Sequence, residues 1–512
     1  MGEPASGVRR GDAIDRLSER DFDLLVIGGG IVGAGIAAHG ARAGLAVALV
    51  DAGDFGGGTS SASSKLVHGG LRYLRLGDVR LVREAHHERR ALTRVVAPHL
   101  VHRMPFLLPL YEGGPFRPAF VQSGILVYST IARSRLHWLV SPNRARRLVP
   151  PLRMDGLRSC ALYADAWTND ARLCLANVRA AADAGATVLN GAEVVRLRTT
   201  RGVLTGAEVR VDGEHVTVNA RVCVNAAGPW VDEVRRLENP FAGTSVRLSK
   251  GAHVLVDAEG TWGAALTVPQ DDVRVTFAVP WYGMLLLGTT DTAWSDGADG
   301  VDVAPEDVTA ILDEAAVALP PELVARARVR ASYAGLRVLP AGDGTSASAP
   351  RETVFTRSRA GMLNVAGGKL TTYRRIALEA LSRVRGDLGL RRIETTPWPL
   401  PGATGLERPL PRELDDDVRE HLVHLYGSLA HEVVACANDD LTLLERLHPR
   451  GPDIRAQVVY AREREWARDA ADVVRRRTTC FYRGLADESV TAGVEELLEP
   501  VASASRPLVS RS

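Results

Sequence analysis

The segment that most restricts the fold is a glycine-rich stretch near the N-terminus, DFDLLVIGGGIVGAGIAAHGARAGLAVALVDAGD. An apolar run (Leu24–Ile27) ends in the pattern Gly28-x-Gly30-x-x-Gly33, and an alanine-rich helical pattern follows. A second apolar run ends at Asp51, 23 residues after Gly28. Gly28 permits a tight turn, Gly30 lets the backbone approach a pyrophosphate, and Gly33 lets the helix pack against the strand. Strand, helix, second strand and acid at this spacing predict a Rossmann-like dinucleotide-binding unit.

Three further glycine-containing stretches fit around one long dinucleotide. The first, GGGTSSASSKLVHGG, is dense in hydroxyl and amide groups suited to a pyrophosphate-linked ligand. The other two, RVCVNAAGPWVDEV and LNVAGGKLTTYRRIALEAL, each have the pattern of a strand that breaks at glycine and continues as a helix. Because no second GxGxxG of comparable quality follows, we expect FAD rather than a pair of nucleotides. The predicted cofactor-binding residues are Gly28, Gly30, Gly33, Asp51, Thr59, Ser60, Ser61, Ser64, Lys65, Leu66, His68, Gly69, Gly70, Val194, Ala227, Gly228, Gly368, Lys369 and Leu370.

Composition excludes several classes of function. With 46% hydrophobic and 24% charged residues the chain is typical of a soluble globular protein, and its net charge of +2 gives no general attraction to nucleic acid. The longest apolar run, Leu24–Ala38, has 15 residues and five glycines, which is too short for a membrane span. Five dispersed cysteines without a CxxC pair favour free thiols in a reducing compartment. We expect no metal site.

The order of its motifs gives the chain a resemblance to a known family. GGGIVGAGIA, TSSASSKLVHGGLRYL, NDARLCLAN, NAAGPWVD, KGAHVLV, GTTD, YAGLRVLP and GGKLTTYR occur in that family's order, from about Asp21 to Arg375. The chain resembles the FAD-dependent, aerobic glycerol-3-phosphate dehydrogenases, within the glycine-oxidase-like flavoproteins. The resemblance implies non-covalent FAD and oxidation of sn-glycerol 3-phosphate at C2 to dihydroxyacetone phosphate. Hydride would pass to flavin N5, and electrons would continue to a membrane quinone.

A dianionic phosphomonoester needs several cations at one place, preferably with forked donors. Cations and a tyrosine near glycine turns supply the candidates, and the resemblance puts the same positions around the substrate: Arg72, Tyr73, Arg337, Arg357 and Lys369. Oxidation of an alcohol also needs a base for the hydroxyl proton. His253, in SKGAHVLV, is the best candidate, and His68 is the rival, although its loop suggests that it positions the flavin. The predicted catalytic residues are His253, Arg337 and Lys369.

Lysine is rare in this sequence. Among 63 Lys plus Arg residues the only lysines are Lys65, Lys250 and Lys369, and all three occur in or beside glycine-containing turns. Arginine cannot easily replace a compact ammonium beside flavin or phosphate, whereas it can do so on the surface. We therefore hypothesise that the three lysines mark one active site, with Lys65 against the cofactor, Lys369 between flavin and phosphate, and Lys250 near the substrate-side sheet.

The motifs predict an α/β protein with a discontinuous FAD-binding domain of Rossmann-like type, an interleaved β-rich substrate domain and a C-terminal helical domain. Residues 1–20 are predicted to form a flexible tail. The C-terminal domain is expected either to cap the substrate side or to form a subunit contact, as in a homodimer. The predicted ranges are 21–75, 165–240 and 355–395 for the FAD domain, 76–164 and 241–354 for the substrate domain, and 400–500 for the helical domain.

A local charge asymmetry suggests a membrane surface as a partner. Residues 113–154 contain seven arginines and no acid, interleaved with aromatic side chains. GILVYSTIARSRLHWLV has the pattern either of an amphipathic helix on an anionic membrane or of a helix packed on the substrate domain. The first reading places the protein in the cytoplasm, peripheral on the inner face of the cytoplasmic membrane. No nucleic-acid partner is expected.

Three alternatives stay open at this point. A glycerol-3-phosphate oxidase would send the electrons to oxygen instead of quinone. An amine or amino-acid oxidase of the same superfamily would bind a carboxylate, and would not need this many cations. A flavoprotein without turnover would act as a binding or sensor module, although the cofactor and phosphate motifs are intact.

Overall fold

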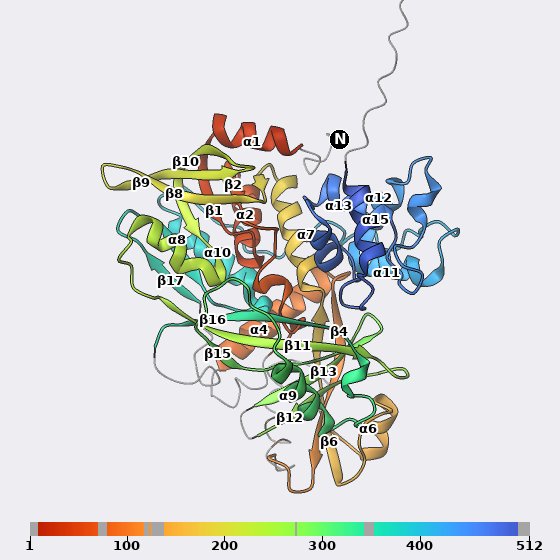
Figure 1. Ribbon diagram of the computed structural model, residues 1–512. Helices are drawn as coiled ribbons and strands as arrows, with labels where there is room; N and C mark the ends of the chain where they lie inside the picture. Colours follow the sequence, from red (N-terminus) through yellow and green to blue (C-terminus); the bar gives the residue numbers. More distant parts are fainter. Residues whose placement is uncertain are drawn as a thin grey trace, which may run out of the picture.

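The computed structural model describes residues 9–69, 79–116, 121, 124, 138–271, 274–342 and 353–499. Within these residues the chain forms two large β-sheets, helices that pack on them, and a group of C-terminal helices (Figure 1). In Figure 1 the first sheet lies in the upper part of the molecule and the second in the lower part, with the C-terminal helices in blue on the right.

The first sheet has the order β17-β18-β10-β1-β2-β7, and an antiparallel extension of β9 and β8 continues from β10. Strands β18, β10, β1, β2 and β7 are parallel neighbours, as strand–helix alternation requires, whereas the edge strand β17 is antiparallel to β18. The strands are β1 (Asp21–Ile27), β2 (Val47–Val50), β7 (Thr187–Leu189), β8 (Ala192–Thr200), β9 (Val203–Val211), β10 (Glu214–Asn225), β17 (Val354–Arg357) and β18 (Leu363–Ala366).

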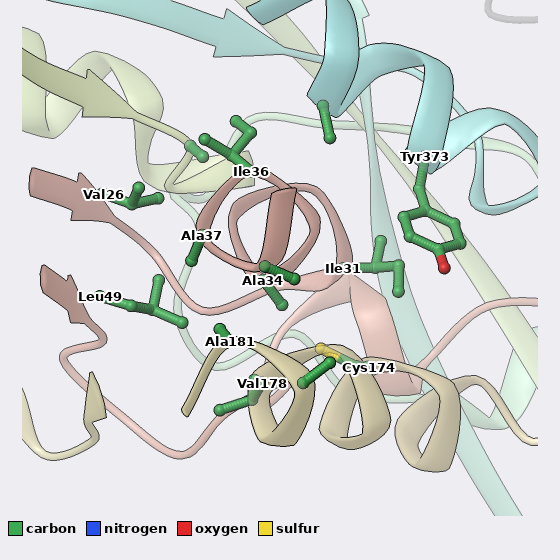
Figure 2. Packing of buried hydrophobic residues seen from close by; sticks show 14 of the residues in the cluster. Val26, Ile31, Ala34, Ile36, Ala37, Leu49, Cys174, Val178, Ala181 and Tyr373 are labelled. Carbon is green, nitrogen blue, oxygen red and sulfur yellow. The ribbon is translucent and has the colours of Figure 1, made fainter. Parts of the chain in front are cut away.

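Helix α2 (Ile31–Arg42) lies between the first sheet and two other helices, α7 (Asp170–Asp183) and α10 (Tyr373–Val384). Figure 2 shows its small apolar side chains facing α7 on one side and Tyr373 on another. The packing is close, because a Cβ atom at Gly35 would lie 3.1 Å from the Tyr373 ring. The alanines and glycines of α2 therefore bring three helices together beneath the dinucleotide turn.

The second sheet has the order β15-β11-β14-β13-β12-β4-β6-β3, with β16 paired to β11 and β5 to β6. Its strands are mostly antiparallel, and α9 (Pro305–Ala316) packs its buried face on β11, β13 and β14. The strands are β3 (Leu66–Val67), β4 (Val101–Tyr111), β5 (Trp138–Val140), β6 (Leu157–Thr168), β11 (Val246–Asp257), β12 (Ala265–Pro269), β13 (Val275–Trp281), β14 (Met284–Gly288), β15 (Thr292–Trp294) and β16 (Val329–Pro340).

The remaining helices lie at the periphery or form the C-terminal helical region, which we define as residues 407–498. That region has its own apolar core around Leu422, Tyr426 and Tyr460. The peripheral helices are α1 (Arg10–Glu19), α4 (Val79–Ala91), α6 (Pro142–Leu148) and α8 (Val231–Glu238), and the C-terminal ones are α11 (Asp416–Tyr426), α12 (Ala430–Ala435), α13 (Ala456–Arg464), α14 (Ala470–Asp472) and α15 (Glu488–Leu498).

Two local predictions from sequence differ from the structure. Residues 10–19, predicted to belong to a flexible tail, form α1, because Leu17 and Ala13 are buried against the first sheet. The interleaved acids and bases of AREREWARDAADVVRRRT predict one salt-bridged packing helix, but the helix is broken after Arg464. The break follows from the buried Glu465, whose carboxylate accepts two hydrogen bonds from Arg172 at 2.6 Å each.

Most strands of the two sheets lie within the matching predicted ranges, although residues 165–168 of β6, in the second sheet, fall within a range predicted for the FAD domain. Every strand of the first sheet falls within the ranges predicted for the FAD domain, apart from the first residue of β17. The short strand β3 lies within those ranges but pairs with β6 of the second sheet. All five cysteines are free thiols. In the described part of the chain, no helix combines the length and apolar character that crossing a membrane requires.

Candidate FAD and substrate site

A cavity of about 920 Å³ lies where the two sheets meet. The first sheet contributes the turns that follow β1, β2, β10 and β18, and the second contributes side chains of β11 and β16. The carboxyl ends of parallel strands meet at one edge of a sheet, so these turns come together there although they are far apart in sequence. The cavity is therefore built from the glycine-containing stretches that the sequence singled out.

The turn between β1 and α2 has the close contacts that a pyrophosphate-binding turn requires. Gly28 has a left-handed φ of +102°, and a Cβ atom at Gly33 would lie 1.9 Å from the main-chain oxygen of Gly28. A Cβ atom at Gly30 would lie 3.0 Å from Oγ of Ser60, on the wall of the cavity. The Ile31 amide donates to Ser60 Oγ at 2.9 Å, so Ser60 caps the first N–H of α2. Gly33 itself does not line the cavity and serves helix packing.

Asp51 lies at the end of β2 and lines the cavity. Its carboxylate accepts the amide of Gly29 at 2.6 Å and the amide of Gly53 at 2.9 Å, which fixes its orientation beside the glycine turn. Burial raises the pKa of Asp51 above its usual value, although both amide bonds act in the opposite direction. A carboxylate held in this way is placed to accept hydrogen bonds from ribose hydroxyls.

The C-terminal helical region contributes a residue to this end of the cavity that sequence reasoning missed. Arg476 lines the cavity and forms an ion pair with Asp54, which lines it too. Arg477 donates to the same carboxylate of Asp54, with its Nη2 atom at 2.8 Å from Oδ1. No local signal identifies Arg476, because its partner is 422 positions away in the sequence.

The hydroxyl-rich loop that follows Gly58 supplies most of one wall. Thr59 Oγ1 donates to the main-chain oxygen of Leu336 at 2.7 Å, which joins this loop to β16 of the second sheet. On the opposite side, Gly368 has a left-handed φ of +93°, and the short turn Leu370–Thr372 then leads into α10. The predicted cofactor residues that line the cavity are Gly28, Gly30, Asp51, Thr59, Ser60, Ser64, Leu66, His68, Val194, Ala227, Gly228, Gly368, Lys369 and Leu370.

His253 lies in the second sheet, on β11, and faces the cavity. Its Nε2 atom is 2.9 Å from Ser64 Oγ, and its ring stacks on Tyr333 with centroids 4.9 Å apart and an interplanar angle of 15°. Burial, together with the cations Arg337 and Lys65, lowers the pKa of His253 well below its usual value of 6.5. The imidazole is therefore neutral at neutral pH and has a lone pair available to accept a proton.

Arg337 and Lys369 line the same cavity as His253. The Arg337 guanidinium donates to Thr289 Oγ1 and to the main-chain oxygen of Thr290, each at 3.0 Å, and lies 3.3 Å from Asp291 Oδ1. Gly251 gives it room, because a Cβ atom there would lie 2.5 Å from Nη2 of Arg337. Arg337, Lys369 and the neutral His253 thus share one cavity with the dinucleotide turn.

Several predicted site residues do not line the cavity. Arg357 is half exposed on the edge strand β17 and pairs with Asp387 at 2.6 Å, so the structure does not bring it together with Arg337 and Lys369 at the cavity. Ser61, Lys65 and Gly69 lie behind the cavity wall. Gly70, Arg72 and Tyr73 lie outside the described residues, as does most of the proposed amphipathic helix.

The three lysines do not share one wall, because Lys369 lines the cavity and Lys65 and Lys250 do not. Lys65 points away from the cavity and pairs with Asp170 at 2.6 Å, and Lys250 pairs with Asp307 at the same distance. Both pairs are buried. In these two cases the ammonium therefore has a buried carboxylate as its partner.

The residues around the cavity fit FAD. Glycines at Gly28 and Gly30 leave room that a Cβ atom would fill, Asp51 is oriented for a ribose, and the hydroxyls of Thr59, Ser60 and Ser64 offer neutral donors along one wall. These are the features of a site for a long dinucleotide with an uncharged ring system at one end.

Comparison with known proteins agrees that the chain is an FAD-binding protein. Residues 23–374 match the family of FAD dependent oxidoreductases, and residues 393–506 match the C-terminal domain of alpha-glycerophosphate oxidase. The structure of glycerol-3-phosphate dehydrogenase from Bacillus halodurans complexed with FAD is similar with a TM-score of 0.76, 28% identity, and coverage of 96% of this chain and 97% of that one. Glycine oxidase from Geobacillus kaustophilus shares the fold, with a TM-score of 0.55, 22% identity, and coverage of 74% of this chain and 98% of that one.

The sequence relatives define the family more closely. Glycerol-3-phosphate dehydrogenase of Synechocystis is 35% identical over 491 residues, covering 89% of this chain and 88% of the relative. Glycerol-3-phosphate dehydrogenase 2 of Mycobacterium tuberculosis is 34% identical over 499 residues, covering 93% of this chain and 84% of the relative. The chain belongs to the family of FAD-dependent glycerol-3-phosphate dehydrogenases, and its cofactor is FAD.

Proposed function

We propose that this protein oxidises sn-glycerol 3-phosphate at C2 to dihydroxyacetone phosphate. The observation that carries the proposal is the convergence of His253, Arg337 and Lys369 on the cavity that the dinucleotide turn also lines. The relatives named above are called glycerol-3-phosphate dehydrogenases, after the same substrate. A site with two cations and a neutral base suits a phosphorylated alcohol.

The cations bind the phosphate in this proposal. Arg337 presents a forked guanidinium that matches a phosphate geometrically, and Lys369 adds a compact charge from the turn before α10. Asp291, at 3.3 Å from Arg337, orients the guanidinium and leaves the net local charge positive. Arg72 and Tyr73 stay predictions as further phosphate ligands.

His253 takes the hydroxyl proton in this proposal. It is neutral at neutral pH, for the reasons given above, and lies on the cavity wall beside Arg337. FAD, when bound, supplies the hydride acceptor at N5 of its ring system. The hydrogen on C2 would leave with the electron pair of the C2–H bond, as a hydride to the flavin. The proton of the C2 hydroxyl would pass to the imidazole, so that the carbonyl of the product forms without a build-up of negative charge on oxygen.

We further propose a quinone as the electron acceptor and a location on the inner face of the cytoplasmic membrane. The support is the basic and aromatic composition of residues 113–154 and the word dehydrogenase in the relatives' names. The likeness of residues 393–506 to an oxidase domain supports oxygen as the second candidate acceptor. Stoichiometric peroxide during turnover would decide for oxygen. Equal pelleting with anionic and neutral liposomes would remove the membrane proposal.

The first experiment is an anaerobic titration of the FAD-loaded protein with sn-glycerol 3-phosphate, followed by the long-wavelength flavin absorbance. Bleaching by this substrate, and not by glycerol or glycine, is the expected result. Bleaching by glycine would instead favour an amino-acid oxidase, a function that the shared fold of glycine oxidase suggests. A bound flavin that none of the three compounds reduces would contradict the proposed substrate and leave the fold assignment intact.

A further inference from the structure

Lys65 is a fully buried cation just behind the cavity wall. Its ammonium makes three hydrogen bonds, to the main-chain oxygen of Ser61 at 3.1 Å, Oδ1 of Asp170 at 2.6 Å and the hydroxyl of Tyr482 at 3.3 Å. The backbone at Lys65 is left-handed, with a φ of +55°, which residues other than glycine and asparagine seldom adopt. The buried contacts of the side chain therefore hold a turn that the backbone alone does not favour.

Three aromatic rings surround this ammonium. The centroids of Trp281, Tyr333 and Tyr482 lie 5.1, 5.0 and 4.5 Å from Nζ of Lys65, within the range of cation–π attraction. Burial alone lowers the pKa of Lys65, but Asp170 raises it above its usual value, so the group is charged. A guanidinium, with its planar fork, does not reproduce three bonds to one compact centre.

The turn at Lys65 is connected to the imidazole of His253 by two routes, one through Ser64 and one through Tyr333. Ser64, the preceding residue, places its Oγ atom 2.9 Å from Nε2 of His253. Tyr333, which stacks on the same imidazole, donates its hydroxyl to the main-chain oxygen of Ser63 at 2.8 Å. Ser63 in turn bonds to Asp170, through Oγ at 2.7 Å and through its amide at 3.0 Å. A change at Lys65 therefore reaches both residues that contact the imidazole ring.

The C-terminal helical region reaches this turn from outside the cavity. The hydroxyl of Tyr482 accepts from Lys65 and donates to the main-chain oxygen of Ser61 at 3.1 Å. Neither Lys65 nor Tyr482 lines the cavity. Their effect on the reaction therefore passes through the contacts of Ser64 and Tyr333 with the imidazole, and through the charge of Lys65, which lowers the pKa of His253.

We propose that Lys65 is a positioning residue for His253: Asp170 and Tyr482 hold its ammonium, and Lys65 in turn holds the Ser64 hydroxyl against Nε2 of the imidazole. This inference rests on the proposed function, because that function gives His253 the substrate proton. The C-terminal helical region thereby influences the proton transfer without contacting the substrate.

The first test compares Tyr482→Phe with Tyr426→Phe, each of which removes one hydroxyl from a buried tyrosine of the C-terminal helical region. Tyr426 is a matched control, because its hydroxyl donates to the main-chain oxygen of Arg477 at 3.1 Å and not to the turn at Lys65. Anaerobic stopped-flow reduction should slow by about tenfold in Tyr482→Phe, since small displacements of reacting groups have large effects on rate, and by less than about twofold in Tyr426→Phe. Equal rates in the two variants would overturn the proposal.

The second test uses Lys65→Met and the charge-balanced double variant Lys65→Met/Asp170→Asn. The groups that face His253 are Ser64, Tyr333 and the cations Arg337 and Lys65. Loss of the Lys65 charge should raise the pKa of His253, because a nearby like charge disfavours the imidazolium. The pH below which the reduction rate falls should therefore rise by about one unit. In the double variant the rate should stay low while this pH returns toward the wild-type value, because the local net charge is restored.

NMR of the FAD-loaded protein with ¹³C-labelled histidine supplies a readout that needs no turnover, with His253→Gln to assign the signal. Lys65→Met should shift the titration of His253 upward. If Lys65→Met leaves both the NMR titration of His253 and the acid side of the pH–rate profile unchanged, the proposal is overturned. If Lys65→Met does not fold, a wild-type rate of anaerobic flavin reduction in both Tyr482→Phe and the double variant would overturn it equally.

These outcomes separate the two proposals. If sn-glycerol 3-phosphate does not reduce the wild-type flavin, the proposed function is wrong. The His253 signals would then still decide whether Lys65 positions the imidazole, because they are recorded without substrate.

Discussion

Nε2 of His253 lies 2.9 Å from Oγ of Ser64, although 189 positions separate the two residues in the chain. Through this hydrogen bond the hydroxyl-rich loop meets the strand that carries the candidate base. The bond occupies one nitrogen of the imidazole, while burial and two cations keep the ring neutral. A proton acceptor with a fixed orientation is thus present in the cavity before any substrate enters.

Replacement of His253 by Gln tests its role as the base. We expect the rate of anaerobic flavin reduction by sn-glycerol 3-phosphate to fall by about 10²–10⁴-fold, the usual contribution of a positioned base. The visible spectrum of bound FAD should stay as in the wild type, because the substitution keeps a polar side chain of similar reach. A variant with full FAD content and an undiminished rate would exclude His253 as the base.

Arg337→Met tests the phosphate site, with Arg357→Met as its control. Loss of a charge-assisted contact, about 1.5–3 kcal/mol, should raise the KM for sn-glycerol 3-phosphate by about 10- to 100-fold. Arg357 is half exposed and paired with Asp387, so its replacement should change KM by less than about twofold. Steady-state kinetics of the two variants measure the contrast. A larger effect at Arg357 than at Arg337 would contradict the placement of the substrate.

Gly33→Ala tests the dinucleotide turn. The added methyl group would lie 1.9 Å from the main-chain oxygen of Gly28, so we expect a loss of about 1–3 kcal/mol in the free energy of unfolding and weaker FAD binding. Gly493→Ala is the control, because no atom lies within 4 Å of a Cβ atom there and the residue is within α15. That change should stabilise the protein by about 0.5–1 kcal/mol. Fluorescence titration of FAD and denaturant unfolding provide both measurements.

Buried histidines predict a loss of stability in acid. Burial lowers the pKa of His39 and of His102 to about 4 and that of His99 to about 3, so all three are neutral in the folded protein at pH 5. Below pH 6.5 the unfolded chain binds protons at these residues that the folded chain does not. The free energy of unfolding should therefore fall as the pH falls, by about 1.4 kcal/mol per pH unit for each histidine, between about pH 5.5 and 4.5.

His102→Gln isolates one of these contributions, since carboxylates that titrate in the same range are left unchanged. Its slope of unfolding free energy against pH should be smaller than the wild-type slope by about 1.4 kcal/mol per pH unit. Denaturant unfolding of the FAD-loaded protein at several pH values between 4.5 and 7 measures the difference. Identical slopes would mean that His102 binds a proton in the folded protein as readily as in the unfolded chain.

Local sequence was sufficient for the parts of the site whose chemistry lies within one strand–turn–helix unit. The glycine turn, Asp51 and the turn before Lys369 were predicted because spacing along the chain determines their geometry. His253 and Arg337 were predicted from short motifs, and the structure places both on the cavity wall. The fold class followed from the same strand–helix patterns.

Contacts between distant segments were not predictable in this way. Asp54 and Arg476 meet across the sequence, and neither has a neighbouring motif that indicates the other. The rarity of lysine indicated that these three positions are unusual, but it did not indicate which groups surround each ammonium. At Lys65 and Lys250 the partner is a buried carboxylate, which no pattern around either lysine reveals. Arg357 was predicted as a ligand because it lies near a glycine turn and the family resemblance puts it beside the substrate, but its strand lies at the exposed sheet edge.

The contacts of Tyr482 with Lys65 and of Arg476 with Asp54 have a consequence for biosynthesis. Their partners are separated by 417 and 422 positions, so the loops around the cofactor lack these supports until nearly the whole chain has left the ribosome. A nascent chain at that stage already contains the dinucleotide turn, whose local strand–helix unit forms early. We therefore expect a chain that ends before Arg476 to bind FAD more weakly than the full chain, because two supports of the cavity wall are missing.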